Sequence, residues 1–161
     1  MIGTKRSTQE KLIGVISDTH GLLRPEAVHA LAGVEMILHA GDVGNSAVLD
    51  ALHDIAPVVA VRGNNDKGKW ADSLPDWEVV KIGAVSIYML HNLKEISINP
   101  VGVFAAVISG HSHKPAVEER RGVLYVNPGS AGPRRFSLPV SVAQLKIKAN
   151  KLSAKLIELS V

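Results

Sequence analysis

The fold is decided by residues 11–42, which read KLIGVISDTHGLLRPEAVHALAGVEMILHAGD. Within them, Lys11–Ser17 is a short apolar run rich in branched residues that stops at DTHG, which predicts a buried strand. Pro25 suits the first turn of a helix that reaches about Leu31, and the next apolar run, Met36–Leu38, stops at HAGD. The stretch therefore predicts a strand, a helix and a second strand.

The same alternation continues beyond it. Asn45 can cap a helix on which Val48, Leu52 and Ile55 share one face. A third apolar run, Pro57–Val61, then ends at RGNND and predicts a third strand. Alternating elements of this kind indicate a parallel sheet.

The second half of the chain is mostly β. Trp77–Ile82 and Ala84–Leu90 predict a hairpin, and after a short helix-like stretch the strand Ala105–Ser109 ends at GHSH. Turn-prone residues separate the remaining strands, Val117–Arg120, Val123–Val126, Val140–Lys148 and Leu152–Leu159. We therefore expect a flexible N-terminal tail over residues 1–10 and a single α/β domain with two packed sheets over residues 11–161.

Composition excludes several classes of protein. The 161 residues include no cysteine, so disulfides, thiolate ligands and a cysteine nucleophile are ruled out. No apolar run approaches the roughly 20 residues of a membrane span, and the first ten residues lack the apolar stretch of a signal peptide, so we expect a cytoplasmic protein without membrane contact. The net charge is +3 but the basic residues are scattered, so nucleic acid is not indicated as a partner.

Polar clusters follow five of the expected strands directly. Loops at the carboxyl ends of parallel strands converge on one rim, where open α/β sheets bind ligands. Two carboxylates, one amide and four imidazoles at one rim are costly unless a pair of divalent cations joins them. Oxygen and nitrogen donors without sulfur suit manganese, iron, zinc, cobalt or nickel alike, and the imidazoles disfavour a dedicated magnesium or calcium site. Of these metals, manganese is the first expectation. The expected metal ligands are Asp18, His20, Asp42, Asn64, His91, His111 and His113.

The ordered set DTH, GD, GNND, the lone His91 and GHSH resembles the signature of calcineurin-like metallophosphoesterases, from Lys11 to about Arg135. The small size and the NPGS at Asn127–Ser130 are most similar to the compact YfcE-like phosphodiesterases, which also resemble the retromer subunit Vps29. The resemblance implies a four-layer α-β-β-α sandwich of two packed mixed β-sheets flanked by helices. It also implies hydrolysis of a small phosphodiester.

The same resemblance divides the ligands between two metals. The first set would be Asp18, His20, Asp42 and His113, and the second would be Asp42, Asn64, His91 and His111. Asp42 would then bridge the two cations, which share a hydroxide that attacks phosphorus and which also stabilise the developing charge. No catalytic residue beyond this metal-bound water is expected.

Asn65 departs from the family pattern. Many relatives carry histidine just after the Gly-Asn, where it can protonate the leaving oxygen, and an amide has no such proton to give. Asp66 is the adjacent acid, but it would need a strongly raised pKa to take over that role. We therefore expect a preference for good leaving groups.

Some residues have two readings from sequence. His39 could be a second hydrogen-bonding partner of the site or a satisfied histidine at a strand end. Asn127 and Ser130 suit a turn better than a ligand site. Arg134 and Arg135 are more typical of a solvated surface than of a phosphate site.

His29 and His53 fall in predicted helices and are left out of the site. Trp70 and Trp77 could form core or border the site.

The rival to an enzyme is a non-catalytic, Vps29-like metal-binding scaffold or protein-interaction module. Exposed hairpins make a homodimer a further expectation.

Overall fold

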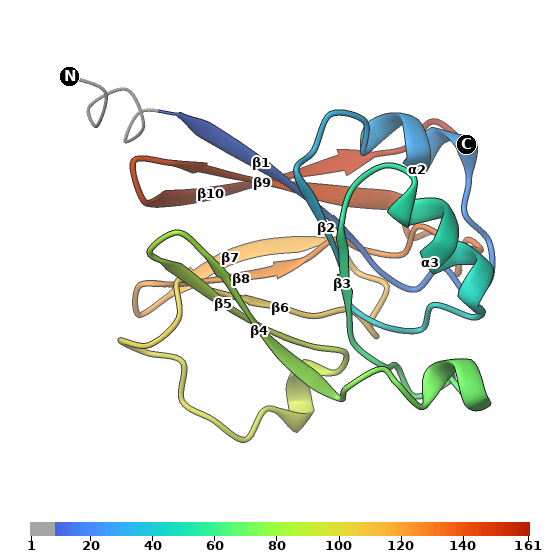
Figure 1. Cartoon of the computed structure of the whole chain (residues 1–161), viewed down its shortest axis with the longest axis horizontal. Coiled ribbons are helices and arrows are strands. Elements are labelled where there is room, and N and C mark those ends of the chain that lie inside the picture. Colours follow the sequence, from blue (N-terminus) through green and yellow to red (C-terminus); the bar gives the residue numbers. More distant parts are fainter. Residues whose placement is uncertain (1–8) are drawn as a thin grey trace.

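The computed structural model describes residues 9–161, and in this part of the chain two five-stranded sheets pack face to face (Figure 1). The strands of the first sheet are β1 (Glu10–Ile16), β2 (Met36–His39), β3 (Val58–Ala60), β9 (Ser141–Lys148) and β10 (Lys151–Glu158). Those of the second are β4 (Trp77–Ile82), β5 (Val85–Leu90), β6 (Ala106–Ile108), β7 (Ala116–Arg120) and β8 (Val123–Asn127).

Both sheets are mixed. The first has the order β10-β9-β1-β2-β3, in which β1, β2 and β3 run parallel while β9 and β10 join as antiparallel strands. The second has the order β4-β5-β6-β8-β7, with a parallel centre and an antiparallel hairpin at each edge. The parallel strands direct five loops, those after β1, β2, β3, β5 and β6, to one end of the sandwich.

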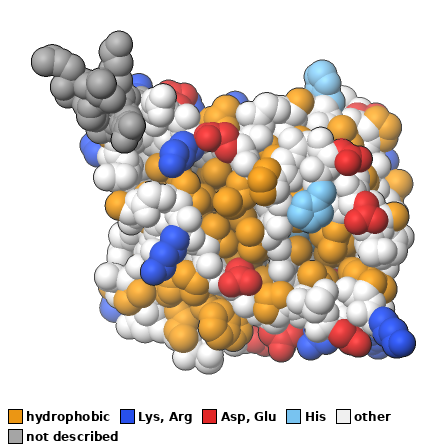
Figure 2. Space-filling model, in the orientation of Figure 1, with side chains coloured by type: hydrophobic (Ala, Val, Ile, Leu, Met, Phe, Trp, Pro, Cys, Tyr) orange, Lys and Arg blue, Asp and Glu red, His pale blue; other side chains and the backbone are white. Residues whose placement is uncertain are grey.

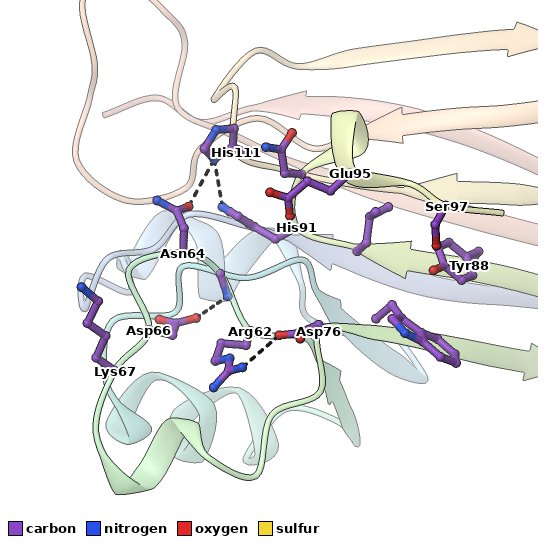
Figure 3. Close-up of a pocket in the computed structure, with 14 residues that line it drawn as sticks. Arg62, Asn64, Asp66, Lys67, Asp76, Tyr88, His91, Glu95, Ser97 and His111 are labelled. Carbon is purple, nitrogen blue, oxygen red and sulfur yellow. Dashed lines mark hydrogen bonds and ion pairs between the residues drawn. The ribbon is translucent and has the colours of Figure 1, made fainter.

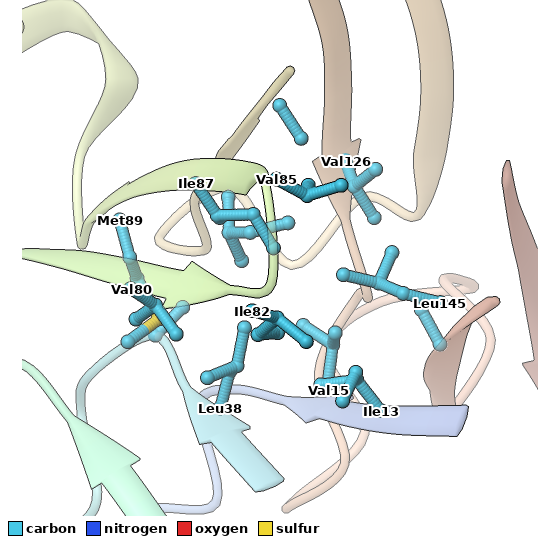
Figure 4. Close-up of a cluster of buried hydrophobic side chains, with 14 of the residues drawn as sticks. Ile13, Val15, Leu38, Val80, Ile82, Val85, Ile87, Met89, Val126 and Leu145 are labelled. Carbon is cyan, nitrogen blue, oxygen red and sulfur yellow. The ribbon is translucent and has the colours of Figure 1, made fainter. Parts of the chain in front are cut away.

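The main core lies between the two sheets (Figure 4). Ile13, Val15 and Leu38 from the first sheet meet Ile87 and Met89 from the second, and all five are buried. Each apolar strand buries the side chains of its inner face here, and an apolar side chain of this size gains about 1.5–3 kcal/mol on burial. The core fixes the separation of the two sheets and therefore of the loops that leave them.

Helices and a short turn cover the outer faces. The helices α2 (Pro25–Ala30) and α3 (Ser46–His53) pack on the first sheet, where Leu31 and Leu52 are buried. The second sheet is covered by the 3-10 turn η2 (Leu93–Glu95) and the segment that follows it to Phe104. The predicted four-layer sandwich of two mixed sheets is confirmed, and its layer over the second sheet is thin.

The helix cap expected at Asn45 is present in the structure. Asn45 caps α3 by accepting a hydrogen bond from the Val48 N–H at 3.2 Å. The helix ends at His53, so Ile55 lies just beyond it, and another short turn, η1 (Lys69–Ala71), follows the third loop. Residues 1–8 of the expected N-terminal tail lie outside the described residues. Within the part of the chain that is described, no helix is long and apolar enough for a membrane span.

Candidate metal centre

The seven residues expected to bind metal lie together where the five loops meet. Asp18 and His20 follow β1, Asp42 follows β2, and Asn64 follows β3. The second sheet contributes His91 after β5 and the pair His111 and His113 after β6. We name these segments the DTH loop (Asp18–His20), the GD loop (41–44), the GNND loop (63–66) and the GHSH loop (110–113).

Most of these seven residues are buried, whereas ligands on an open rim would be exposed to solvent. Asp18, Asp42, His91 and His113 are each at most 5% exposed. Only Asn64 and His111 are exposed. The expectation of ligands on an open rim is therefore corrected, because loops from both sheets close over the two carboxylates.

The backbone of the site turns sharply. Among residues 9–161, nine residues other than glycine have positive φ. Five of them belong to the site, namely Asp18, His20, Asp42, His111 and His113, with φ between 47° and 70°. This left-handed region is sparsely populated by residues with a Cβ, although Asp and His enter it more readily than most. Each turn directs a side chain back over the strand end, so local strain is stored where the polar atoms converge.

The polar atoms lie within ligand-sharing distance of one another. Asp18 Oδ1 is 3.4 Å from His113 Nε2 and 3.8 Å from His20 Nε2. Asp42 Oδ2 is 3.3 Å from His91 Nε2 and 3.7 Å from His20 Nε2. Two ligands about 2.1 Å from one cation are separated by roughly 3.0–3.5 Å, so the spacings of His113 and His91 suit shared metal coordination and those of His20 are a little longer.

Asp18 connects two groups of possible ligands. One consists of Asp18, His20 and His113, and the other of Asp18, Asp42 and His91. His111 extends the second group, because its Nδ1 is 3.3 Å from His91 Nε2 and 3.2 Å from the Asn64 side-chain oxygen. Asp42 faces both groups as well, because its Oδ2 is 3.7 Å from His20 Nε2 and 3.3 Å from His91 Nε2. The arrangement is that of two adjacent sites with both carboxylates between them.

Three buried polar atoms of the described residues have no hydrogen-bond partner, and all three are in the site: Asp18 Oδ1, His20 Nε2 and His113 Nδ1. An unpartnered buried polar atom costs about 1–3 kcal/mol. A divalent cation would compensate Asp18 Oδ1 and His20 Nε2 together, and His113 would face the same cation with its Nε2. The residues present therefore fit the metals that the donor set implies.

His91 is held with one nitrogen free for a metal. Its Nδ1 donates to the Ala40 carbonyl at 2.8 Å, so in the neutral ring the lone pair is on Nε2, which faces Asp42. Burial lowers the pKa of His91, but the hydrogen bond to Asp42 and the Asp18 charge outweigh it, and the net pKa is raised.

The two carboxylates stay ionised. Burial raises the pKa of Asp42, yet the hydrogen bonds from His91 and from the Asn65 N–H lower it further, to well below its usual range. For Asp18, burial again raises the pKa, and His113, Ser17 and the His91 charge reverse the effect. Ionised carboxylates are the form that coordinates metal.

Asn65 holds the Asp42 carboxylate from both sides. Its backbone N–H donates to Asp42 Oδ1 at 2.9 Å, and its side-chain amide donates to Oδ2 at 3.1 Å. The neighbouring Asp66 is buried and accepts from the backbone N–H groups of Gly63, Val43 and Gly44. The carboxylate of Asp66 therefore ties the GNND loop to the GD loop, and this geometry argues against the general-acid role considered from sequence.

His39 is a fully buried link behind the site. Its Nδ1 accepts from the Gly41 N–H at 3.1 Å, so Nε2 carries the proton and donates to Thr19 Oγ1 at 3.0 Å. Thr19 in turn donates to the Val43 carbonyl at 2.7 Å. Burial lowers the pKa of His39 to about 4, and the Asp18 charge offsets this only in part. The second of its two readings holds, and this neutral histidine also joins the DTH and GD loops.

The NPGS segment, Asn127–Ser130, fastens two loops. The Asn127 amide donates to the Gly110 carbonyl at 3.0 Å and to Ser112 Oγ at 3.1 Å. Ser130 donates to the Asp18 carbonyl at 3.0 Å. A Cβ on Gly110 would overlap Ser17 Oγ, so only glycine allows the GHSH loop to approach this closely. The turn predicted from sequence thus has a second task that sequence did not reveal.

Two clefts open beside His111. One holds about 520 Å³ and is lined by Arg62, Asn64, Trp77, Tyr88 and His91 among others (Figure 3). The other holds about 610 Å³ and includes Tyr125, Arg135 and Phe136 in its lining.

The structure also gives the positions of the histidines, tryptophans and arginine that were considered from sequence outside the seven expected ligands. His29 and His53 are exposed on their helices. Trp70 packs on the core beneath α2 and α3, whereas Trp77 borders a cleft. Arg134 donates to the Leu138 carbonyl at 3.4 Å within its own loop.

Comparison with known proteins agrees with this site. Residues 12–150 match the model of the calcineurin-like phosphoesterase superfamily domain. The chain is similar to a probable metallophosphoesterase of Methanocaldococcus jannaschii, with 38% identity over 160 residues that cover 91% of this chain and 80% of the relative. It is also similar to the phosphodiesterase YfcE of Escherichia coli K12, with 27% identity covering 80% of this chain and 84% of YfcE.

Among solved structures, Vps29 of Cryptosporidium parvum shares the fold, with a TM-score of 0.73, 21% identity and coverage of 94% of this chain and 99% of that one. The resemblance noted from the DTH, GD, GNND and GHSH motifs is confirmed. The chain belongs to the calcineurin-like phosphoesterase superfamily.

Proposed function

We propose that this chain is a divalent-metal-dependent phosphohydrolase that cleaves small phosphodiesters. The observation that carries the proposal is the meeting of seven oxygen and nitrogen donors from five loops. Two of the donor atoms, Asp18 Oδ1 and His20 Nε2, are buried without a hydrogen-bond partner in the part of the chain described. A cluster of this kind is costly to maintain unless cations bind to it.

In this proposal the seven residues hold two metals. Asp18, His20, Asp42 and His113 would hold one cation, and Asp42 with Asn64, His91 and His111 would hold the other. When bound, two divalent cations supply a hydroxide at neutral pH and stabilise the charge that develops on a transferring phosphoryl group. Manganese is our first candidate, and iron, zinc, cobalt and nickel suit the same donors.

The residues of the chain position these ligands. The Ala40 carbonyl keeps the proton of His91 on Nδ1 and leaves Nε2 free. Asn65 fixes both oxygens of Asp42, and Asp66 holds together the two loops that carry Asp42 and Asn64. Partners of metal ligands commonly affect metal affinity by 10- to 100-fold.

A phosphodiesterase is supported over a scaffold by the full set of ligands. The relatives named above are a probable metallophosphoesterase and a phosphodiesterase. The Vps29 likeness concerns the fold. A surface used only for docking has no need of an open, charged site with buried unpartnered ligands.

The test is hydrolysis of bis(p-nitrophenyl) phosphate after chelation and reloading with each of the five metals. We expect turnover with at least one metal and loss of turnover to background in Asp42→Asn. The matched control is Asp50→Asn, which changes an exposed carboxylate on α3 and should retain activity. A wild-type protein that binds two metals yet cleaves no diester would favour the scaffold.

A further inference from the structure

The two clefts beside the metal centre differ in chemistry. The Trp77 cleft runs from His111 and Asn64 to Trp77, and the Phe136 cleft runs from His111 to Tyr125 and Phe136. Since phosphorus in a diester carries two substituents, a pair of clefts that meet at the reacting centre gives each substituent its own place.

Hydrogen-bond acceptors line the middle of the Trp77 cleft. Glu95 lies between His111 at one end and Ser97 with Tyr88 at the other (Figure 3). Cations line both clefts, Arg62 and Lys67 the Trp77 cleft and Lys94, Lys114 and Arg135 the Phe136 cleft. The carboxylate and the hydroxyl in the middle of the Trp77 cleft suit an arm that bears hydroxyl groups.

The far end of the Trp77 cleft is an exposed aromatic surface. Trp77 is 56% exposed, and its indole stacks on the Tyr88 ring at 5.8 Å with an angle of 18° between the planes. Tyr88 is buried and contacts Phe104 at 5.4 Å. The indole is therefore backed by fixed rings, and covering it with another aromatic ring removes a large apolar area from water.

The distance to the metal centre indicates the length of the arm. Trp77 is paired with Leu90, the residue before His91, and it stacks on Tyr88, three residues before His91. The three residues of β5 from Tyr88, on which the indole lies, to His91 span about 10 Å. A base joined to the phosphate through a sugar suits a separation of this order.

We propose that the Trp77 cleft binds a nucleoside-type arm of the substrate, with an aromatic base stacked on Trp77 and a hydroxyl-bearing sugar facing Glu95 and Ser97. This inference rests on the proposed phosphodiesterase function and names the class of its substrate. Trp77 is then a residue that determines specificity, since it contacts the substrate away from the reacting atoms.

The first test compares two diesters with the same leaving group, thymidine 5′-(p-nitrophenyl) phosphate and methyl p-nitrophenyl phosphate. The ratio of their kcat/KM values reports the nucleoside arm alone. Base stacking on an aromatic side chain predicts that Trp77→Ala lowers this ratio by about fivefold to a hundredfold. Phe136→Ala removes an exposed aromatic side chain from the other cleft and should change the ratio by less than about twofold.

The second test does not depend on turnover. The chain has two tryptophans, so Trp70→Phe leaves Trp77 as the single indole reporter. Thymidine 5′-monophosphate should quench its fluorescence saturably, while inorganic phosphate at the same concentrations should not.

The two proposals fail in different ways. If no metal supports cleavage of the methyl ester but the nucleotide still quenches Trp77, the hydrolase proposal fails and the binding cleft stands. If the methyl ester is cleaved while Trp77→Ala leaves the substrate ratio unchanged and the nucleotide quenches nothing, the nucleoside arm is overturned and the hydrolase stands.

Discussion

At the scale of the residue, we expect Asn65 to decide which esters are cleaved well. An amide cannot protonate a leaving oxygen, and the adjacent Asp66 is engaged by three backbone N–H groups. A general acid is typically worth about 10²–10⁴ in rate. Without one, esters with alkyl leaving groups should be cleaved slowly, and aryl diesters should be cleaved much faster. The measurement is kcat/KM for an aryl and an alkyl diester at saturating metal. Equal rates would mean that another acid operates.

Asn65→His carries this expectation further. An imidazole that reaches the leaving oxygen should raise the alkyl rate and barely move the aryl rate. The variant also loses the side-chain bond of Asn65 to Asp42 Oδ2, so its metal affinity should fall by about tenfold. Calorimetric titration with manganese separates the two effects, with Asn99→Ala, an exposed amide elsewhere, as the control.

His39 makes stability depend on pH. Its pKa is about 4 in the folded chain against an ordinary value of 6.5, because burial disfavours the imidazolium. Between these values the unfolded chain binds more protons, so the stability of the fold rises with pH and is lost as pH falls from 6.5 toward 4. The loss reaches about 3 kcal/mol.

His39→Gln should flatten this slope. Urea unfolding of the chelated protein at several pH values between about 4 and 7 measures it. Asp18 and Asp42 have lowered pKa values, so their contribution is lost at lower pH and is common to both proteins. Parallel slopes in the two proteins would contradict the role given to His39.

At the scale of the element, the GHSH loop is positioned by a turn that is distant in sequence. Asn127→Asp keeps the acceptor for the Gly129 N–H but removes the donor to Gly110 and Ser112. We expect the turn to remain and the affinity of the metal held by His111 to fall by about tenfold, with a loss of about 1 kcal/mol in stability. Metal content after dialysis reports the affinity, and urea unfolding reports the stability. Unchanged metal retention would show that the loop keeps its shape without Asn127.

The sequence predicts most strands and helices, but it does not predict how deeply the site residues are buried. Branched runs that end at DTHG, HAGD and GHSH identify strands and the loops after them, because hydrophobic periodicity is local. The burial of Asp18 and Asp42 is not local, since it depends on loops of two sheets meeting in space. The same reason hides the link between Thr19, in the loop after β1, and His39, at the end of β2. The role of each site residue as a ligand stays a prediction.

At the scale of the whole molecule, the proposed metals would join the two sheets. The first sheet supplies Asp18, His20, Asp42 and Asn64, and the second supplies His91, His111 and His113. We expect two metals per chain by elemental analysis, because seven donors exceed the four of one tetrahedral site. Free metal at a hundred times its Kd should stabilise the fold by about 2.7 kcal/mol, and a chelator should reverse the shift in Tm. Saturation at one equivalent would contradict the two-metal centre.

The homodimer expected from sequence remains a prediction, and it would need exposed apolar side chains at its interface. Figure 2 shows hydrophobic side chains reaching the surface near β3 and β4, with charged groups around them. The strand β3 is half-buried along its length and lies at an edge of its sheet. Sedimentation velocity at several protein concentrations measures the state, and a single monomeric boundary throughout would exclude the dimer.

The left-handed turns at the site affect how such a protein can change over generations. Asp18 and Asp42 both have φ of 55°, where glycine rests without the roughly 1 kcal/mol that a Cβ adds. A single base change converts an aspartate codon to glycine, so one mutation can abolish a carboxylate, relax the backbone and remove a buried charge together. In the metal-free chain this relief is set against the hydrogen bonds that the carboxylate accepts, and in the metal-loaded chain also against the stability that the bound metal supplies. A lineage that no longer uses the metal can therefore settle on glycine at these turns, whereas a lineage that keeps the metal is held to aspartate.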